Sequence, residues 1–475
     1  MLTTIALAAT VASPAKSASL TIYNDGFALV KEVRSLNLTT GEQDVVVEDV
    51  AQMIEANSVA VKSLTAPNSF LVLEQNYQYD LISPQAILAR AVGQRIAFNR
   101  ILPNGERERI AGVLLSAPYA IVSDENGRQQ NTYNGMVIRT DNGSILLNPS
   151  GEIEVATLPG GLISKPSLLW VLDSERAGTQ DIEFSYLTRG FSWKSDYVMT
   201  LEKAGKVGML KGWVTVSNNS GTDYKNARLN FLAGEVNRYV EQMPRGFGGG
   251  APANMAAREM ADMAEQSFGE YHLYKMEREV DVANKQIKQV SLLERTGIPV
   301  TQHMIADLGP FYQNPRSEDR VGSGPIKPNV YIQFKNDEAS RLGVPLPKGT
   351  FKVFQEDQDG DIQMLGESFI EHTPRNETVN ILVGKAFDVV VESKIVDFRW
   401  LDGDRNKGSV MTIEFEVRNR KKDPTTVTVM DRKYGDVSVT GNPQPRRLDA
   451  NTFAWDLTLQ PDETKTVRYV VTTRW

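Results

Sequence analysis

Cysteine is absent from the 475 residues of this chain, and histidine is rare. The missing cysteines exclude disulfides, thiol nucleophiles and thiolate metal sites, so packing alone must stabilise the fold. The histidines are His272, His303 and His372, and no two of them have the spacing of about three to five residues found in zinc or haem motifs. We therefore predict no histidine-based catalysis, and no metal or other cofactor.

An excess of positive charge is also missing. Lysine and arginine total 52 against 59 acidic residues, which gives a net charge of −7. No general attraction to nucleic acid or anionic lipid is expected from such a chain. Hydrophobic residues make up 41% of the sequence, which indicates a globular protein. Its length predicts roughly three domains, at about 150 residues for each.

Sequence motifs that specify a reaction are absent as well. The chain has no Walker loop, Rossmann fingerprint, serine hydrolase elbow or HExxH motif. A pair of acidic residues brought together by folding could still serve a glycosidase. The sequence alone does not give the separation of such a pair, so an enzyme stays open as the less favoured class.

The N-terminus is typical of a secretory signal. An alanine-rich apolar run over 2–12 is followed by the small residues of "SPAKSAS". We predict a signal peptide over 1–18, with cleavage between Ala15 and Ser19, and an exported, periplasmic or extracellular protein. No later stretch has the roughly 18 apolar residues that a membrane span requires. The alternative is a docked or disordered N-terminus of a cytosolic protein.

Strand signals dominate the rest of the chain. Short runs rich in Val, Leu, Tyr and Phe, broken by Asn, Asp, Gly and Pro, predict an N-terminal β module over 19–93. A short helix over 84–92 is predicted within it, because Ser83 suits the N-cap, Pro84 the first helical position and Gly93 the end.

Asn-Gly pairs mark the next segment, over 94–162. The pairs begin at Asn104, Asn126, Asn134 and Asn142, each between strand-like runs. Asn-Gly supplies the positive φ angles of tight hairpins, so this segment predicts a small antiparallel β-barrel or sheet.

Residues 184–201, "FSYLTRGFSWKSDYVMTL", are rich in aromatic residues, and the question is whether they form a site or a core. Apolar residues fall on even numbers up to Tyr186 and on odd numbers from Phe191, through Trp193 and Tyr197. Since alternate side chains face opposite sides of a sheet, a bulge or bend is expected at Gly190. We favour a buried structural motif over a ligand site.

Two sandwich regions are predicted after residue 162. Residues 163–388 form a β-sandwich region, with a mobile insert over 241–269 and a fluctuating helix over 254–266. Residues 389–475 form an immunoglobulin-like β-sandwich. Two strand pairs, around "NNSG" and around "NRKKD", share a plan in which an Asn closes the first strand. A second long loop is expected over 314–328.

Two segments suggest metal binding, and each has a simpler interpretation. Five methionines cluster in and beside the insert: Met243, Met255, Met260, Met263 and Met276. Thioethers bind copper(I), but methionine is more often a core filler or a partner contact. The run "EDQDGDIQ" (356–363) is similar to the start of a calcium loop, yet its glycine precedes the third acid. An Asp-Gly hairpin turn explains it better.

Several motifs carry a family resemblance. They are "DGFALVKE" (25–32), "EQNYQYDL" (74–81), "YLTRGFSWKSDYVMTL" (186–201), "NNSGTDYKNARLNFLAGEVNR" (218–238), "EYHLYKMER" (270–278), "KQVSLLE" (288–294), "LPKGTFKVFQED" (346–357) and "GKAFDV" (384–389). Together they resemble the bacterial domain-of-unknown-function family 4139, over nearly the whole mature chain. Tyr186, Gly190, Trp193 and Tyr197 stand in its most recognisable motif.

The resemblance implies an exported β-rich protein and supplies no catalytic residues. A more distant likeness of the C-terminal region to the mucoidy-inhibitor A-like proteins implies a role in the cell envelope, although their long coiled-coil segment has no counterpart in this sequence.

The sequence thus predicts a mainly β, multi-domain protein with few short helices. The leading hypothesis is non-catalytic binding or scaffolding in the cell envelope, with the insert at 241–269 as the contact surface for an envelope protein or polymer. The alternatives are a carboxylate-dependent hydrolase of envelope polymers and, more weakly, copper handling by the methionines. The oligomeric state stays open.

Overall fold

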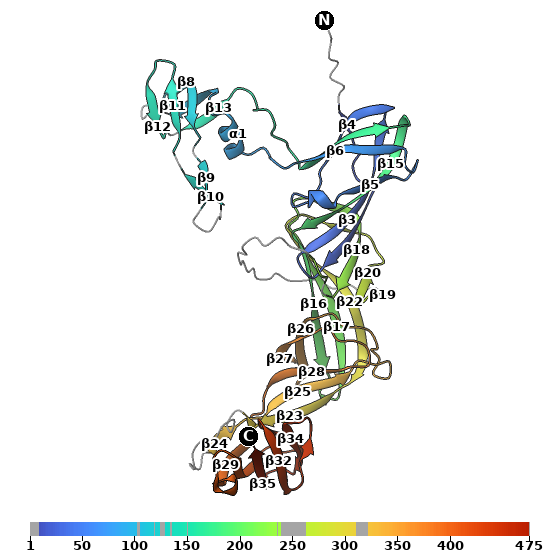
Figure 1. Cartoon of the computed structure of the whole chain (residues 1–475), viewed down its shortest axis with the longest axis vertical. Coiled ribbons are helices and arrows are strands. Elements are labelled where there is room, and N and C mark those ends of the chain that lie inside the picture. The colour runs from blue at the N-terminus through green and yellow to red at the C-terminus, as the bar shows by residue number, and fades with distance from the viewer. Residues whose placement is uncertain are drawn as a thin grey trace. The chain divides into compact units, whose positions relative to one another are not determined.

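The structure is a computed structural model, and it describes residues 9–101, 105–117, 119–123, 129–133, 135–149, 151–234, 236–238, 263–309 and 322–474. Strands make up most of these residues (Figure 1), which confirms the prediction of a mainly β protein. One α-helix, α1 (Pro84–Arg90), and two short 3₁₀ helices, η1 (Ala56–Ser58) and η3 (Leu401–Gly403), occur in the part described. No helix there is long and apolar enough to cross a membrane.

The chain divides into two compact units. The first comprises Met1–Ser192, Ser217–Asn230 and Arg278–Gln286, and the second comprises Trp193–Val216, Phe231–Glu277 and Ile287–Trp475. The predicted boundaries at residues 93, 162 and 388 stay predictions.

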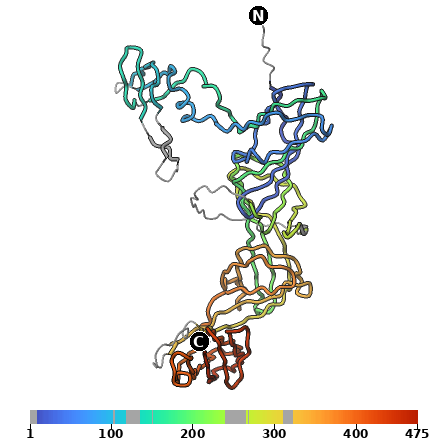
Figure 2. The backbone as a smooth tube through the Cα atoms, viewed as in Figure 1, coloured from blue at the N-terminus to red at the C-terminus, as the bar shows by residue number. Residues whose placement is uncertain are grey.

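Two sheets of the first unit contain the strands predicted for the N-terminal module. One sheet has the order β1 (Thr10–Val11), β4 (Gly41–Glu48), β14 (Ser167–Ser174), β6 (Phe70–Gln78). The other contains β18 (Tyr224–Ala233), β2 (Ser17–Tyr23), β3 (Phe27–Leu38), β15 (Gly178–Arg189) and β5 (Ala60–Ser63), with β21 (Val280–Val282) beside β18. The long antiparallel pair β3–β15 is visible in Figure 2, where blue and green strands lie side by side.

The segment rich in Asn-Gly pairs forms a separate small sheet in the first unit. Its order is β12 (Ile145–Leu147), β11 (Val137–Thr140), β8 (Arg107–Ser116), β7 (Arg95–Ile101), β13 (Glu152–Val155), and a hairpin of β9 (Tyr119–Ser123) and β10 (Gln129–Tyr133) accompanies it. The order is that of an open antiparallel sheet. Gly143, with φ +89°, makes the β11–β12 turn as its Asn-Gly pair predicted.

Helix α1 follows its sequence signals and packs on this small sheet. The Ser83 hydroxyl accepts the N–H of Ala86 at 3.0 Å, and Pro84 takes the first helical position. Leu88 and Ala91 are buried in one core with Ile96, Leu114, Met136 and Ile138 of the sheet. The amphipathic helix is therefore stabilised by tertiary packing, since it is too short to persist alone.

The second unit contains three larger sheets. The first has the order β22 (Gln286–Pro299), β17 (Val207–Asn218), β16 (Phe191–Leu201), β26 (Gly349–Glu356), β27 (Ile362–Ile370). The next has the order β28 (Thr378–Lys385), β25 (Asn329–Lys335), β23 (Thr301–Asp307), β31 (Thr425–Arg432), β34 (Thr452–Leu459), β33 (Arg446–Arg447). The last has the order β24 (Gly322–Ile326), β29 (Val389–Trp400), β30 (Gly408–Asn419), β35 (Thr464–Arg474), β32 (Asp436–Asn442).

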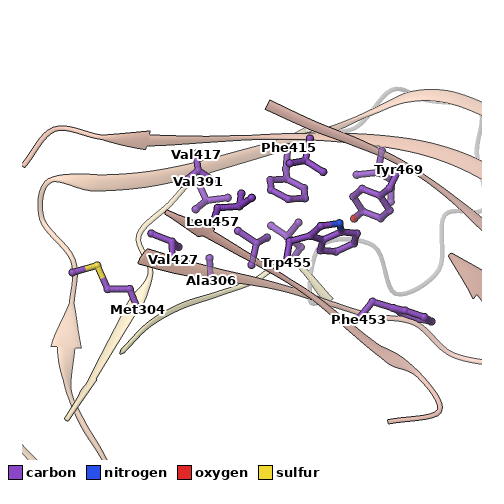
Figure 3. Close-up of a cluster of buried hydrophobic side chains, with 14 of the residues drawn as sticks. Met304, Ala306, Val391, Phe415, Val417, Val427, Phe453, Trp455, Leu457 and Tyr469 are labelled. Atoms are coloured by element: carbon purple, nitrogen blue, oxygen red, sulfur yellow. The ribbon is translucent and has the colours of Figure 1, made fainter. Parts of the chain in front are cut away.

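The C-terminal core lies between the last two of these sheets. Figure 3 shows the rings of Phe415 and Tyr469, from β30 and β35, facing Trp455 of β34. The centroid of the Trp455 ring is 4.5 Å from that of Tyr469 and 5.4 Å from that of Phe415. Such aromatic contacts add to the hydrophobic stabilisation of the two apolar faces.

The two strand pairs with a shared sequence plan also share a turn. Asn218 and Asn419 are both fully buried at the end of a strand. The Asn218 amide donates to the carbonyl of Thr222 at 3.0 Å, and the Asn419 amide donates to that of Asp423 at 3.1 Å. The side-chain oxygen of each asparagine accepts the N–H of the residue two positions later, Ser220 for Asn218 and Lys421 for Asn419. The plan predicted to be shared by the two strand pairs is thus confirmed for the turn that follows each asparagine.

Two sequence expectations are wrong. The long loop expected over 314–328 includes β24, which pairs with β29 through a register shift. Its glycines and proline give no alternating pattern, so the pairing was not visible in the sequence. The helix expected over 254–266 is wrong at its end, because β19 (Ala264–Phe268) forms a hairpin with β20 (Tyr271–Lys275). The rest of that helix lies outside the described residues.

Candidate functional site

The aromatic-rich motif lies in the interior of the two units. In β15 the residues Ile182, Phe184 and Tyr186 are fully buried, and in β16 Trp193 and Tyr197 are 4% and 1% exposed. Ser192 and Lys194 lie exposed on the opposite face of β16. The predicted switch of the buried side chains from even-numbered positions in β15 to odd-numbered positions in β16 is therefore confirmed. The aromatic side chains of the motif contribute to packing and are not open to solvent.

Gly190 connects β15 to β16 and permits the switch from even-numbered to odd-numbered buried positions. Its φ is +86°, and a Cβ atom placed there would lie 2.7 Å from the carbonyl oxygen of Asn219. The N–H of Asn219 in turn donates to the Gly190 carbonyl at 2.7 Å. Only glycine fits both the left-handed backbone and this close approach.

A Gly190→Ala substitution should destabilise the protein more than Gly143→Ala. Gly143 has nearly the same φ, +89°, but nothing lies within 4 Å of its virtual Cβ. The control should cost about 1–2 kcal/mol from backbone strain alone, and the Gly190 variant should cost more because of the contact with Asn219. Thermal unfolding of both variants measures this difference, and equal losses would show that the close contact is unimportant.

Tyr197 and its neighbours hold a proline-containing loop of the second unit. The Tyr197 hydroxyl donates to the Pro347 carbonyl at 2.8 Å, and Tyr274 donates to the Pro345 carbonyl at 3.0 Å. Burial raises the pKa of both phenols. These tyrosines therefore stay protonated and serve as hydrogen-bond donors.

A buried polar cluster surrounds Tyr186 in the first unit. Arg34 donates to the Glu32 carboxylate at 2.6 and 2.9 Å, and its guanidinium also reaches the Glu48 carbonyl at 2.6 Å. The Tyr186 hydroxyl donates to Glu32 at 3.2 Å and lies 3.3 Å from the Tyr224 hydroxyl. Glu32 is 2% exposed and Arg34 is 4% exposed. Every charged group of the cluster is thus enclosed and paired.

Burial raises the pKa of the Glu32 carboxyl, and the charge of Arg34 only partly opposes this. A raised carboxyl pKa is common in catalytic sites, but neither described cavity is lined by Glu32. The cluster connects the two strands, because Tyr186 of β15 donates to Glu32 of β3.

Sequence reasoning missed this cluster, although a signal was present. From Ala28 to the end of β3 the buried positions are even-numbered, with Val30 and Leu36 on that face. Glu32 and Arg34 occupy the same face, two residues apart and with opposite charge. A paired acid and base on an apolar strand face indicate a buried ion pair.

A second buried ion pair lies in the C-terminal core. Lys433 pairs with Asp431, and both are at most 3% exposed. The Tyr469 hydroxyl donates to the other carboxylate oxygen of Asp431 at 2.6 Å. Burial lowers the pKa of the Lys433 ammonium, while Asp431 opposes the shift. A lysine of this kind can act as a nucleophile, but neither described cavity reaches it.

The two described cavities do not resemble hydrolase sites. One, of about 480 Å³, lies at the end of β16 in the second unit, and Lys206 is its one ionisable lining residue. The other, of about 330 Å³, lies on the small sheet and is lined by Arg100, Arg107 and a single acid, Glu152. A glycosidase needs two acids in one site, and neither of these cavities supplies them.

The segments that suggested metal binding hold no metal cluster in the part of the chain that is described. Met243, Met255 and Met260 lie outside it, so copper binding stays a prediction. The run at 356–363 forms the β26–β27 hairpin turn, in which Asp357 accepts the N–H groups of Asp359 and Asp361 at 3.0 Å. This confirms the hairpin interpretation. The Gln363 amide, which donates to Asp357 at 3.2 Å, and these backbone N–H groups lower the pKa of the Asp357 carboxyl.

The three histidines do not come together in one site. His272 contacts Glu265 at 2.8 Å within the β19–β20 hairpin, and His303 contacts Thr301 on β23. His372 accepts the N–H of Lys348 at 3.2 Å. Each belongs to a different element, and none adjoins a second histidine.

Exposed apolar side chains gather on strands at sheet edges. On β27, Ile362, Met364 and Phe369 are 59%, 51% and 57% exposed. On β6 the exposed residues are Leu71 and Leu73, and on β12 they are Ile145 and Leu147. All three strands end the order of their sheets. β27 also lies against β28, because a Cβ atom placed at Gly366 would be 2.2 Å from the Val383 carbonyl oxygen. Its exposed apolar face, and not a free backbone edge, is therefore where another chain can bind.

A family model described as Domain of unknown function (DUF4139) matches residues 182–475, more than half of the chain. The match includes Tyr186, Gly190, Trp193 and Tyr197. The motifs at 25–32 and 74–81 lie outside it, so it is shorter than the coverage that the motifs implied. No curated protein matches the chain.

Proposed function

We propose that this chain, which belongs to the DUF4139 family, is a non-catalytic binding or scaffolding protein of the cell envelope. The observation that carries the proposal is the contrast between enclosed charges and exposed apolar strands. The ion pairs of Glu32 and Lys433 are buried and satisfied, whereas β27 exposes four large apolar side chains, those of Ile362, Met364, Leu365 and Phe369. Chemistry requires accessible reactive groups, while binding requires accessible surface.

The outer face of β27 is the contact surface in this proposal. The register with β26 places Ile362, Met364 and Phe369 on one face, because their partners Glu356, Phe354 and Thr350 alternate along β26. Lys352 and Glu367 lie between them on the same face and form an ion pair. The exposed Glu356 on the same face leaves this surface with one net negative charge among its apolar side chains, and these apolar side chains favour a protein partner.

Export and the C-terminal architecture belong to the same proposal. The alanine-rich run over 2–12 and the small residues that follow it support a periplasmic or extracellular location. Strands of 389–475 in two facing sheets around the core of Figure 3 support an immunoglobulin-like sandwich there, to which β23, β24, β25 and β28 from before residue 389 also contribute. The insert at 241–269 stays a second predicted contact, and most of it lies outside the described residues.

A double substitution, Met364→Ser and Phe369→Ser, tests the contact surface. Partner recovery by affinity isolation from envelope fractions should fall at least about tenfold, because apolar anchors dominate interface energies. The thermal stability should hardly change, since both side chains are exposed in the free protein.

Lys352→Ser with Glu367→Ser is the matched control. It removes a surface ion pair from the same face and should leave partner recovery within about twofold of the unsubstituted protein. Equal recovery with the apolar double variant and the unsubstituted chain would exclude β27 as the contact surface.

A further inference from the structure

Residues 10–13, within the predicted signal peptide, add a strand to the edge of a sheet. β1 runs parallel to β4, with Thr10 opposite Val45 and Val11 opposite Val46. The N–H of Ala12 donates to the Val46 carbonyl at 2.9 Å. This short strand ends the order β1-β4-β14-β6, so it covers the outer backbone groups of β4.

The contact extends from β4 to β3. The N–H of Ser13 donates to the Ser35 carbonyl at 2.9 Å, and the N–H of Ser35 donates back to the Ser13 hydroxyl at 2.9 Å. The segment then continues to Lys16, whose N–H donates to the Val33 carbonyl at 2.7 Å. Backbone groups and one serine thus hold 10–13 in place.

Side-chain size sets what this edge accepts. Ala12 is 9% exposed and lies over a strand whose Val45 and Val47 are fully buried, whereas Val11 is 57% exposed. A small residue is therefore needed at the inner position, and the outer position is free. No ion pair involves residues 10–13 in the described part of the chain, so backbone pairing and size determine recognition.

Removal of the signal peptide would uncover this edge. Cleavage after Ala15 would remove β1 but leave β2 intact, because β2 begins at Ser17 and is fixed by the fully buried Leu20 and Ile22. The backbone groups of β4 that β1 covers would then face solvent. This step rests on the export that is part of the proposed function.

We propose that the outer edge of β4 in the mature chain is a strand-addition site for an extended segment of a partner protein. The segment runs parallel to β4 and places a small side chain where Ala12 lies in the precursor. The precursor's own residues 10–13 occupy the site until cleavage.

A synthetic peptide with the sequence of residues 8–15, AATVASPA, tests the site. A fluorescently labelled form should bind saturably to the chain that begins at Lys16, and at least tenfold more weakly to the chain that retains 1–15. An Ala12→Pro peptide should bind at least tenfold more weakly, because proline lacks the N–H that donates to Val46. A Val11→Ser peptide is the control and should bind within about twofold, because Val11 points outward.

Absent binding, equal binding to both chains, or no effect of Ala12→Pro would overturn the site. The intact mass of the protein from fractionated cells tests export separately. An exported chain that keeps Thr10 would overturn the strand-addition site and leave the envelope function standing. An uncleaved chain in the cytoplasm would overturn both.

Discussion

Replacing Arg34 with methionine is expected to lower the stability of the first unit by about 3–5 kcal/mol. The substitution would leave the Glu32 carboxylate buried at 2% exposure with only the Tyr186 hydroxyl as a donor. The Glu48 carbonyl would also lose its partner. Native-state hydrogen exchange of the β3 and β15 amides measures the loss, and the β30 amides of the second unit serve as an internal control.

The double variant Glu32→Leu/Arg34→Met should recover much of this loss, because no charge is then left buried. Equal protection of β3 in the Arg34→Met variant and the unsubstituted protein would contradict a buried ion pair.

The Arg34→Met penalty should also depend on pH. The pKa of Glu32 is raised in the folded state, so its contribution to stability is present below its usual value of 4.5 and is lost as pH rises through the raised pKa. Without Arg34 the Glu32 carboxylate loses the guanidinium that stabilises its negative charge, so the pKa of Glu32 rises further. The penalty should therefore be largest near neutral pH and shrink in acid. A penalty that does not vary with pH would contradict this assignment.

Lys433→Met should lower the stability of the second unit by a similar amount, about 3–5 kcal/mol. It would leave the Asp431 carboxylate, 1% exposed, paired with the Tyr469 hydroxyl inside the aromatic core but without its cationic partner. Exchange of the β31 and β35 amides reports the loss.

Lys394→Met on β29 is the control for Lys433→Met. Lys394 forms an exposed ion pair with Glu414 at 3.0 Å, so its loss should cost less than about 1 kcal/mol. Equal effects of the two substitutions would show that burial does not strengthen the Lys433 pair.

Local patterns in the sequence predicted much of the fold. The alternation along β15 and β16, the capped helix α1 and the Asn-closed turns depend on residues close together in the chain. Parallel pairings were not predictable in this way. β16 pairs with β26 from Ser195 opposite Gly349, and β23 pairs with β31 from Met304 opposite Val427. A period of two shows which face of a strand is buried but does not identify its neighbour.

The candidate contact surface was less visible still. Ile362, Met364 and Phe369 do not share a period of two, because a register shift between Val353 and Phe354 places an extra residue, Leu365, in β27. The sequence therefore looked like an irregular strand. Exposure of these apolar residues depends on which face of the β26–β27 pair is left uncovered, which only the folded structure reveals.

Site-specific photo-crosslinking in living cells tests the binding function most directly. A photoreactive residue at Met364 should give a discrete crosslinked partner, and the same residue at Gln363, exposed on the opposite face of β27, should not. Crosslinks of equal yield at both positions, or none at Met364, Ile362 and Phe369, would contradict a binding role for this surface.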